Sequence, residues 1–187
     1  LMDILNIKNK LFNFLKDKKY NLLFDLIKSD ESLNLDIQDI NYNYLIDYLI
    51  MDNQIEIIEY ILKNNKIRLD ILDADNKIIL YKPIKYNNII ILELLLEYDK
   101  KNIGISILDN KDNDGNNALF YCCLYNNFDA FKILYNKKAD IYCTNNNNIN
   151  LVNFLLKYNR NNMLILLLEN ELKKNLNFLN IVKNSKN

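Results

Sequence analysis

The order of hydrophobic and polar positions along the chain predicts pairs of short helices. The clearest example is a polar turn followed by two apolar stretches, at 112–117, 118–125 and 128–135. In an earlier segment, Ile58, Ile61 and Leu62 have the i, i+3, i+4 spacing of a helix that buries one face. A single pair cannot cover its apolar face, so neighbouring pairs are expected to stack.

The same pattern recurs at a nearly constant interval. A shift of 33 residues places Tyr125 on Tyr158, and a shift of 39 residues in the other direction places it on Tyr86. The longer interval indicates a longer connection around 100–106. We therefore expect five units, of which the first is degenerate with helices near 8–16 and 21–28, at 4–38, 39–72, 73–111, 112–144 and 145–177.

An asparagine stands between the two expected helices in four of the five units, at Asn53, Asn87, Asn126 and Asn159. A helix that ends there and turns sharply requires a left-handed backbone, which Gly tolerates best and Asn next best. The four residues predict one turn geometry that is used repeatedly.

The end of the chain differs from the other units. Residues 163–168 are apolar all round, so their outer side needs cover. We expect residues 171–183 to fold over the last unit, with 178–187 as a C-terminal cap, because apolar residues lie near one face there, namely Leu172, Leu176, Leu179 and Val182. The alternative is a chain cut from a longer repeat array.

One unit can be compared position by position with a known repeat. It has Asp112-x-x-Gly115-x-Asn117-Ala118-Leu119, Cys122-Cys123, Asn126-Asn127-x-Asp129-x-Phe131-x-x-Leu134 and Lys138-Ala139-Asp140-Ile141. This unit resembles the ankyrin repeat, D-x-x-G-x-T-P-L-H-x-A-A-x-x-G-x-x-E-x-V-x-x-L-L-x-x-G-A-D-I. It departs from that pattern where the family has Thr-Pro, His and two alanines, at Asn117-Ala118, Phe120 and Cys122-Cys123.

The resemblance covers nearly the whole chain and implies a single all-α solenoid domain, 1–187, with short turn or β-hairpin fingers. Loss of the Thr-Pro-Leu-His motif predicts irregular stacking. The resemblance also implies protein binding through the finger tips and the concave surface of the first helices. The candidate binding residues there are Lys77, Lys85, Tyr86, Asn113, Asp114, Asn116, Leu124, Tyr125, Lys157 and Tyr158; the second unit offers Ile40 and Met51.

Three of these candidates occupy the same position at the end of the first helix, namely Tyr86, Tyr125 and Tyr158. Two interpretations stay open. Stacking could align the tyrosines into a ladder that binds a partner, since tyrosine provides a large contact area with a polar tip. Alternatively, each ring packs on its own neighbouring turn.

Composition argues against several other functions. The 24 basic and 24 acidic residues balance, so no charge excess favours nucleic acid or an anionic membrane. The chain has no histidine, which excludes Ser-His-Asp and Cys-His catalysis. Without CxxC spacing, Cys122, Cys123 and Cys143 are expected to be buried thiols instead of a zinc site or redox pair. We expect no enzymatic activity, metal or cofactor.

Four aspartates could be mistaken for acid–base or calcium-binding groups. Asp36 and Asp39 recur 34 residues later as Asp70 and Asp73, in segments that read as turns. Since Asp commonly caps turns and helix starts, we expect structural roles for all four.

The N-terminus has no signal peptide pattern, and the apolar runs are far shorter than the ~20 residues of a membrane span. We therefore expect a soluble, cytoplasmic protein. Heavy use of Asn, Lys, Ile and Tyr is typical of AT-rich coding and resembles ankyrin paralogues of giant DNA viruses or protists. By that analogy the host cytoplasm and a host-interaction role are expected.

These observations predict a monomeric scaffold that binds a protein partner, and neither nucleic acid nor membrane. The alternative is a target-recruiting adaptor, present as a fragment of a longer protein, that serves ubiquitination or host interaction.

Overall fold

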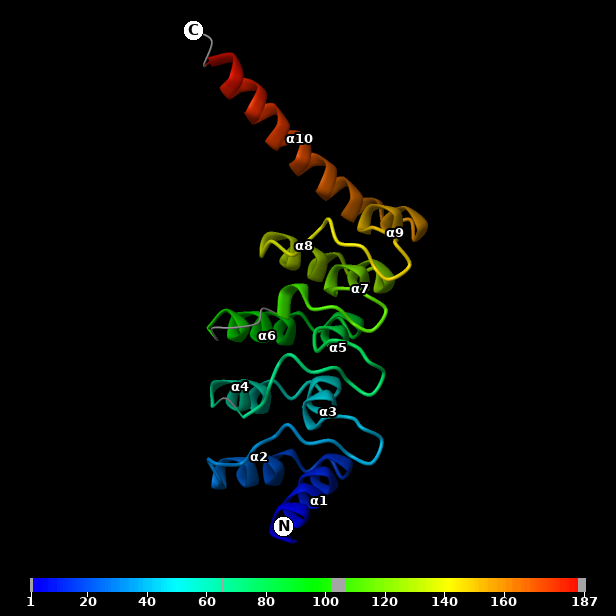
Figure 1. Cartoon of the computed structure of the whole chain (residues 1–187). Coiled ribbons are helices and arrows are strands. Elements are labelled where there is room, and N and C mark those ends of the chain that lie inside the picture. The colour runs from blue at the N-terminus through cyan, green and yellow to red at the C-terminus, as the bar shows by residue number, and fades with distance from the viewer. Residues whose placement is uncertain (1, 65, 102–106, 185–187) are drawn as a thin grey trace.

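The computed structural model describes residues 2–64, 66–101 and 107–184. Helix pairs lie on one another in layers, with the first helices in one column and the second helices in another (Figure 1). The elements are α1 Met2–Lys16, α2 Tyr20–Ser29, α3 Leu45–Met51, α4 Ile55–Lys63, α5 Tyr81–Lys85, α6 Ile89–Lys101, the 3-10 helix η1 Ile107–Asp109, α7 Ala118–Tyr125, α8 Phe128–Asn136, α9 Leu151–Lys157 and α10 Asn161–Asn184.

Each of the five predicted units contains one helix pair, and from the second layer to the fifth the helices of each column contact those of the next layer. In the first-helix column, α3 contacts α5, α5 contacts α7 and α7 contacts α9. In the other column, α4 contacts α6, α6 contacts α8 and α8 contacts α10. The predicted all-α solenoid is therefore confirmed. Residues 102–106 of the predicted long connection lie outside the described residues.

The turn between the paired helices has the predicted geometry. Asn53, Asn87, Asn126 and Asn159 have φ of 55°, 52°, 54° and 54°. The degenerate first unit has Lys18 at this place, with φ of 56°. Thus the sequence signal of a left-handed asparagine is confirmed at all four positions.

A continuous apolar core runs through the stack because each pair buries a stripe against its neighbours. The predicted stripe Ile58, Ile61 and Leu62 is no more than 2% exposed. Cys122 and Cys123 are fully buried between layers, where the family has two small alanines. Among the described residues, no buried side-chain N or O atom lacks a hydrogen-bond partner.

The structure differs from the predicted C-terminal cap. α10 is one unbroken helix from Asn161 to Asn184, and Figure 1 shows it leading away from the stack instead of folding over it. The sequence of α10 contains no Gly or Pro that would end the helix near 171. The fold-back expected for 171–183 is therefore wrong, and residues 185–187 of the expected cap lie outside the described residues.

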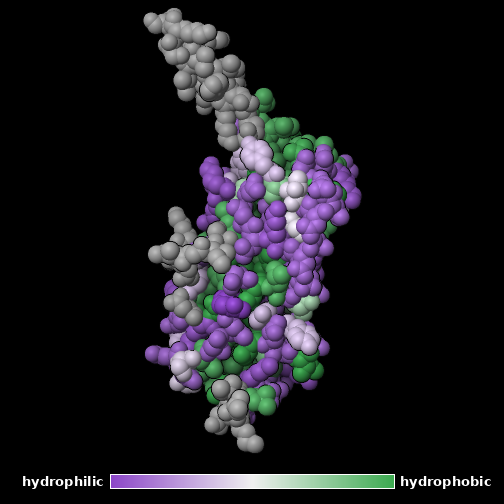
Figure 2. Space-filling view, in the orientation of Figure 1, coloured by the Kyte–Doolittle hydropathy of each residue, from purple (hydrophilic) through white to green (hydrophobic). Residues whose placement is uncertain are grey.

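The last layer consequently keeps an apolar outer side. In Figure 2 this surface lies beside α9 and the start of α10, at the upper end of the stack. Its exposed side chains are Val152 at 41%, Leu156 at 55%, Ile165 at 50% and Leu168 at 52%.

Candidate protein-binding surface

Each finger is a tight turn organised by one side-chain oxygen. Oδ1 of Asp39 accepts hydrogen bonds from the backbone N–H groups two and four residues later, at 2.8 and 3.0 Å. Asp73, Asp112 and Asn145 accept the equivalent pairs of bonds in the next three fingers. The turn-capping role predicted for Asp39 and Asp73 is therefore confirmed.

The second carboxylate oxygen of each finger aspartate is bound by the first helix of its own repeat, nine residues later. The Tyr48 hydroxyl donates to Oδ2 of Asp39 at 2.5 Å. The Tyr121 hydroxyl donates to Oδ2 of Asp112, and Nζ of Lys82 donates to Oδ2 of Asp73. These contacts fix each of the three fingers to the first helix of its own repeat.

Sequence reasoning missed this link, although a signal for it was present. In the fifth repeat the finger residue is Asn145, and the residue nine positions later is Phe154, which has no hydroxyl or amine. The chain therefore carries a hydrogen-bond donor at this helix position in three fingers with Asp, and none in the finger with Asn.

Lys82 also joins two repeats. Its Nζ donates to Oδ1 of Asp47 at 3.0 Å, besides its bond to Asp73, and all three side chains are at most 12% exposed. Burial raises the pKa of Asp47, and Lys82 counteracts only part of that shift. Burial alone would lower the pKa of Lys82, but the two carboxylates raise it, so the lysine stays charged.

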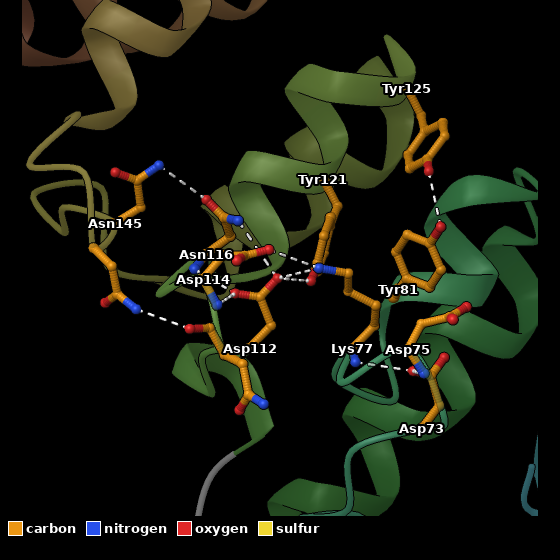
Figure 3. Close-up of polar contacts among 12 residues, drawn as sticks. Asp73, Asp75, Lys77, Tyr81, Asp112, Asp114, Asn116, Tyr121, Tyr125 and Asn145 are labelled. Atoms are coloured by element: carbon orange, nitrogen blue, oxygen red, sulfur yellow. Dashed lines mark hydrogen bonds and ion pairs between the residues drawn. The ribbon is translucent and has the colours of Figure 1, made fainter. Parts of the chain in front are cut away.

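Several predicted finger-tip residues contact the adjacent finger. Nζ of Lys77 lies 3.1 Å from Oδ2 of Asp112 and 2.9 Å from Oδ2 of Asp114. Figure 3 draws both ion pairs as dashed lines. Oδ1 of Asn116 accepts from Nδ2 of Asn145 at 3.2 Å. Lys77, Asp114 and Asn116 thus tie fingers together, and only 22% of the Lys77 side chain is exposed.

Two further contacts between the fourth and fifth fingers involve backbone atoms. The carbonyl of Asn113 accepts from Nδ2 of Asn146 at 2.8 Å. The N–H of Asn146 donates to the carbonyl of Asp114 at 2.9 Å. A Cβ at Gly115, whose φ is 78°, would stand 2.7 Å from the Asn146 nitrogen, so this close approach requires glycine.

The three predicted tyrosines do not have equivalent surroundings. The hydroxyls of Tyr125 and Tyr81, which belong to neighbouring repeats, lie 2.9 Å apart. Figure 3 shows the two rings facing each other across this contact. The Tyr158 ring packs on Phe154 of its own helix, with centroids 4.7 Å apart. Tyr86 is the most open of the three, at 47% exposure. Tyr158 therefore fits the packing interpretation, while Tyr86 offers the free surface that a binding role needs.

The remaining candidates are exposed on the first helices, close to these rings. Nζ of Lys85 lies 5.3 Å from the Tyr81 ring centroid and 5.5 Å from that of Tyr86. Nζ of Lys157 lies 5.6 Å from the Tyr158 centroid, and Leu124 is 39% exposed. Cation–π contact orients both lysines without neutralising them.

A groove of about 590 Å³ lies between α1 and the second finger. Its apolar lining includes Leu5, Phe12, Ile40 and Tyr48. Ile40, at the finger tip, is 94% exposed. α1 begins well before the point where the other first helices begin, so its additional turns face a finger here.

The cysteines are chemically protected. Burial raises the pKa of Cys122 well above its usual value, that of Cys123 to about 12 and that of Cys143 to about 11. A thiol that stays protonated is a poor nucleophile and metal ligand.

The described part of the chain offers neither a metal site nor a membrane span. Within it, no group of three or more His, Cys, Asp or Glu residues could hold a metal ion. None of its helices combines the length and apolarity that crossing a bilayer demands.

Comparison with known proteins agrees with the geometry. The model of the ankyrin repeat family, in three copies, matches residues 48–145. A protein of Acanthamoeba polyphaga mimivirus, described as an ankyrin repeat protein, is 34% identical over 144 residues. That match covers 76% of this chain and 19% of the mimivirus protein, so the chain spans about a fifth of this relative. The chain belongs to the ankyrin repeat family.

Proposed function

We propose that this chain is a non-enzymatic, monomeric scaffold that binds a partner protein through the concave face of its first helices. The observation that supports the proposal best is a set of exposed side chains on first helices whose other faces are packed in the core. Tyr86, Lys85 and Leu124 project from helices whose inner faces are closed by the core. Ankyrin repeats generally bind proteins, and this surface offers aromatic, cationic and apolar contacts.

The finger tips are the second part of the proposed surface. Asn113, Asp114, Asn116 and Lys77 already bond to neighbouring fingers. We therefore propose that these bonds hold the finger tips in one arrangement. A partner would contact the side chains that stay exposed there, such as that of Asp114, which is 66% exposed.

A capture experiment tests the concave face. Wild-type protein, the Tyr86→Ala/Leu124→Ala double variant and a Tyr142→Ala control would each serve as bait for lysate of the source or host cell. Tyr142 is 74% exposed in the loop after α8, away from the first helices. We expect the wild type and the control to retain a partner that the double variant loses. Equal capture by all three would contradict binding through this face.

The second candidate is an adaptor, in which these repeats select a target and another domain acts on it. It is favoured by the match to only 19% of the mimivirus relative. For a viral protein, the proposed location is the host cytoplasm and the proposed role is host interaction. Transcript sequencing of the source would test the adaptor, since an open reading frame that adds a non-repeat domain is expected.

A further inference from the structure

One position of the first helices recurs in every layer and forms a row on the face that we propose for partner binding. It lies two residues before the left-handed residue that ends each first-helix turn, in all five repeats. From the first repeat to the fifth, the residues at this position are Lys16, Met51, Lys85, Leu124 and Lys157. Cationic and apolar side chains therefore alternate from layer to layer.

All five side chains of this row are exposed. Met51 is 48% exposed and Leu124 is 39% exposed, whereas the equivalent core positions one residue earlier are buried in most layers. An extended ligand lying along the row would therefore meet an apolar side chain at every second layer and a cationic one at the layers between.

The charge of the row is not neutralised by the protein itself. None of Lys16, Lys85 and Lys157 forms an ion pair with a described residue. The neighbouring acids are already engaged, because Asp17 pairs with Lys19 at 2.8 Å and Asp52 with Lys18 at 3.6 Å. A ligand with carboxylates at matching intervals would complement the three lysines.

The spacing of the row selects the shape of that ligand. Packed helices lie about 8–10 Å apart, which sets the step between the contacting first helices α3, α5, α7 and α9. A polyproline II segment has three residues per turn and rises ~3.1 Å per residue, so every third side chain recurs on one side after about 9 Å. A β-strand repeats a face after roughly 6.6 Å and would lose this match within two layers.

We propose that the row binds an extended acidic segment of a partner protein, in polyproline II-like conformation. Every third residue of the segment faces the row, with carboxylates opposite the lysines and apolar side chains opposite Met51 and Leu124. This inference rests on the proposed function, since it names the chemistry of the partner that the concave face takes.

A synthetic probe tests the pattern directly. The probe is a labelled thirteen-residue peptide with glutamate at its first, seventh and thirteenth positions, leucine at its fourth and tenth, and proline or serine elsewhere. The pattern reads the same in both directions, so the orientation of the bound chain does not matter. We expect saturable binding by fluorescence anisotropy that weakens as salt rises, because exposed charges are screened.

A charge swap locates the contact. Lys85→Glu should weaken binding roughly tenfold or more, while Lys132→Glu, an exposed lysine on α8, should leave it unchanged. A peptide whose central glutamate is replaced by lysine should bind Lys85→Glu better than it binds the wild type. Circular dichroism would verify that both variants are folded.

Three outcomes would overturn the inference: no saturable binding of the probe, equal binding by Lys85→Glu and Lys132→Glu, or equal binding of a peptide with the same composition at two-residue spacing. Each leaves the proposed function intact if the capture experiment still depends on Tyr86 and Leu124. Conversely, loss of that dependence would contradict the proposed function irrespective of the probe.

Discussion

Left-handed residues recur from repeat to repeat in two kinds of turn in this chain. One kind ends the first helices, at Asn53, Asn87, Asn126 and Asn159. The other closes the fingers, at Tyr42, Asn76, Gly115 and Asn148, with φ of 64°, 58°, 78° and 55°. Gly and Asn adopt this backbone at little cost, which explains why they fill most of these positions.

Asn126 allows the helix-junction turn to be tested. Asn126→Gly should be neutral or slightly stabilising, because Gly enters the left-handed region freely. Asn126→Val should lower the free energy of unfolding by ~1 kcal/mol or more, since a β-branched residue is strained there. Denaturant unfolding of both variants measures the difference, and equal midpoints would contradict the assigned turn.

Tyr42 is the exception among the finger positions. Its bulky side chain is 70% exposed, while its backbone has the left-handed conformation that Asn and Gly adopt in the other fingers. Tyr42→Asn should therefore raise the free energy of unfolding by about 0.5–1 kcal/mol. Thermal unfolding would reveal the gain, with Tyr142→Asn as a control of similar exposure.

At the scale of elements, each finger and its first helix form a unit through the Asp–Tyr or Asp–Lys contact. Removing the Tyr121 hydroxyl leaves a buried carboxylate of Asp112 with one donor fewer. Tyr121→Phe should thus cost about 1–2 kcal/mol of unfolding free energy. In an Asp112→Asn background, which resembles the Asn145 and Phe154 combination of the fifth repeat, the same change should cost much less.

A double-mutant cycle by chemical denaturation measures this coupling. We expect the effects of Asp112→Asn and Tyr121→Phe to be clearly non-additive. Strictly additive effects would show that the hydroxyl and the carboxylate do not act together.

The stability that Asp112 contributes through the fourth finger should depend on pH. Burial alone would raise the pKa of Asp112, but hydrogen bonds from Tyr121 and Asn116 and the charge of Lys77 hold it below its usual value. Its stabilising contribution is therefore complete above the unfolded pKa of about 3.9 and is lost as pH falls through the lower folded pKa.

Asp112→Asn removes this dependence. The variant should be less stable than the wild type at pH 7, and the difference should narrow as pH falls from about 5 to 2. Denaturant unfolding at several pH values tests the sign. If the free energies of unfolding of the wild type and of Asp112→Asn differed by the same amount at every pH in this range, a lowered pKa of Asp112 would be contradicted.

The sequence allowed the fold to be predicted but only part of the candidate site. Asn126 and its equivalents must adopt a left-handed backbone, which depends on the residue itself. The recurrence of Asn at this position of the repeat is therefore visible in the sequence. The direction of a side chain depends instead on its neighbours in space. Tyr125 and Tyr158 hold equal places in the repeat, yet one meets Tyr81 of an earlier repeat and the other meets Phe154 of its own helix.

At the scale of the whole molecule, the two ends of the stack are unequal. Among the described side chains, the first layer exposes one large apolar residue on each helix, Leu5 and Leu22, whereas α9 of the last layer alone exposes both Val152 and Leu156. The equivalent residues one layer earlier are Leu119 and Cys123, which are completely buried beneath the fifth repeat. The periodicity of the solenoid thus leaves an apolar layer uncovered at its C-terminal end.

This asymmetry predicts how the 187-residue chain behaves in solution. Exposed apolar patches promote association, so the wild type, proposed to be a monomer at low concentration, should self-associate weakly as its concentration rises. Val152→Lys/Leu156→Lys should suppress that association and change the melting temperature little, because neither side chain lies in the core. Light scattering coupled to gel filtration measures the first effect, and calorimetry the second. Lys replacements at Ile90 and Leu22, which are 57% and 50% exposed away from this end, control for added charge. If those controls reduced association equally, net charge and not the uncovered layer would be responsible.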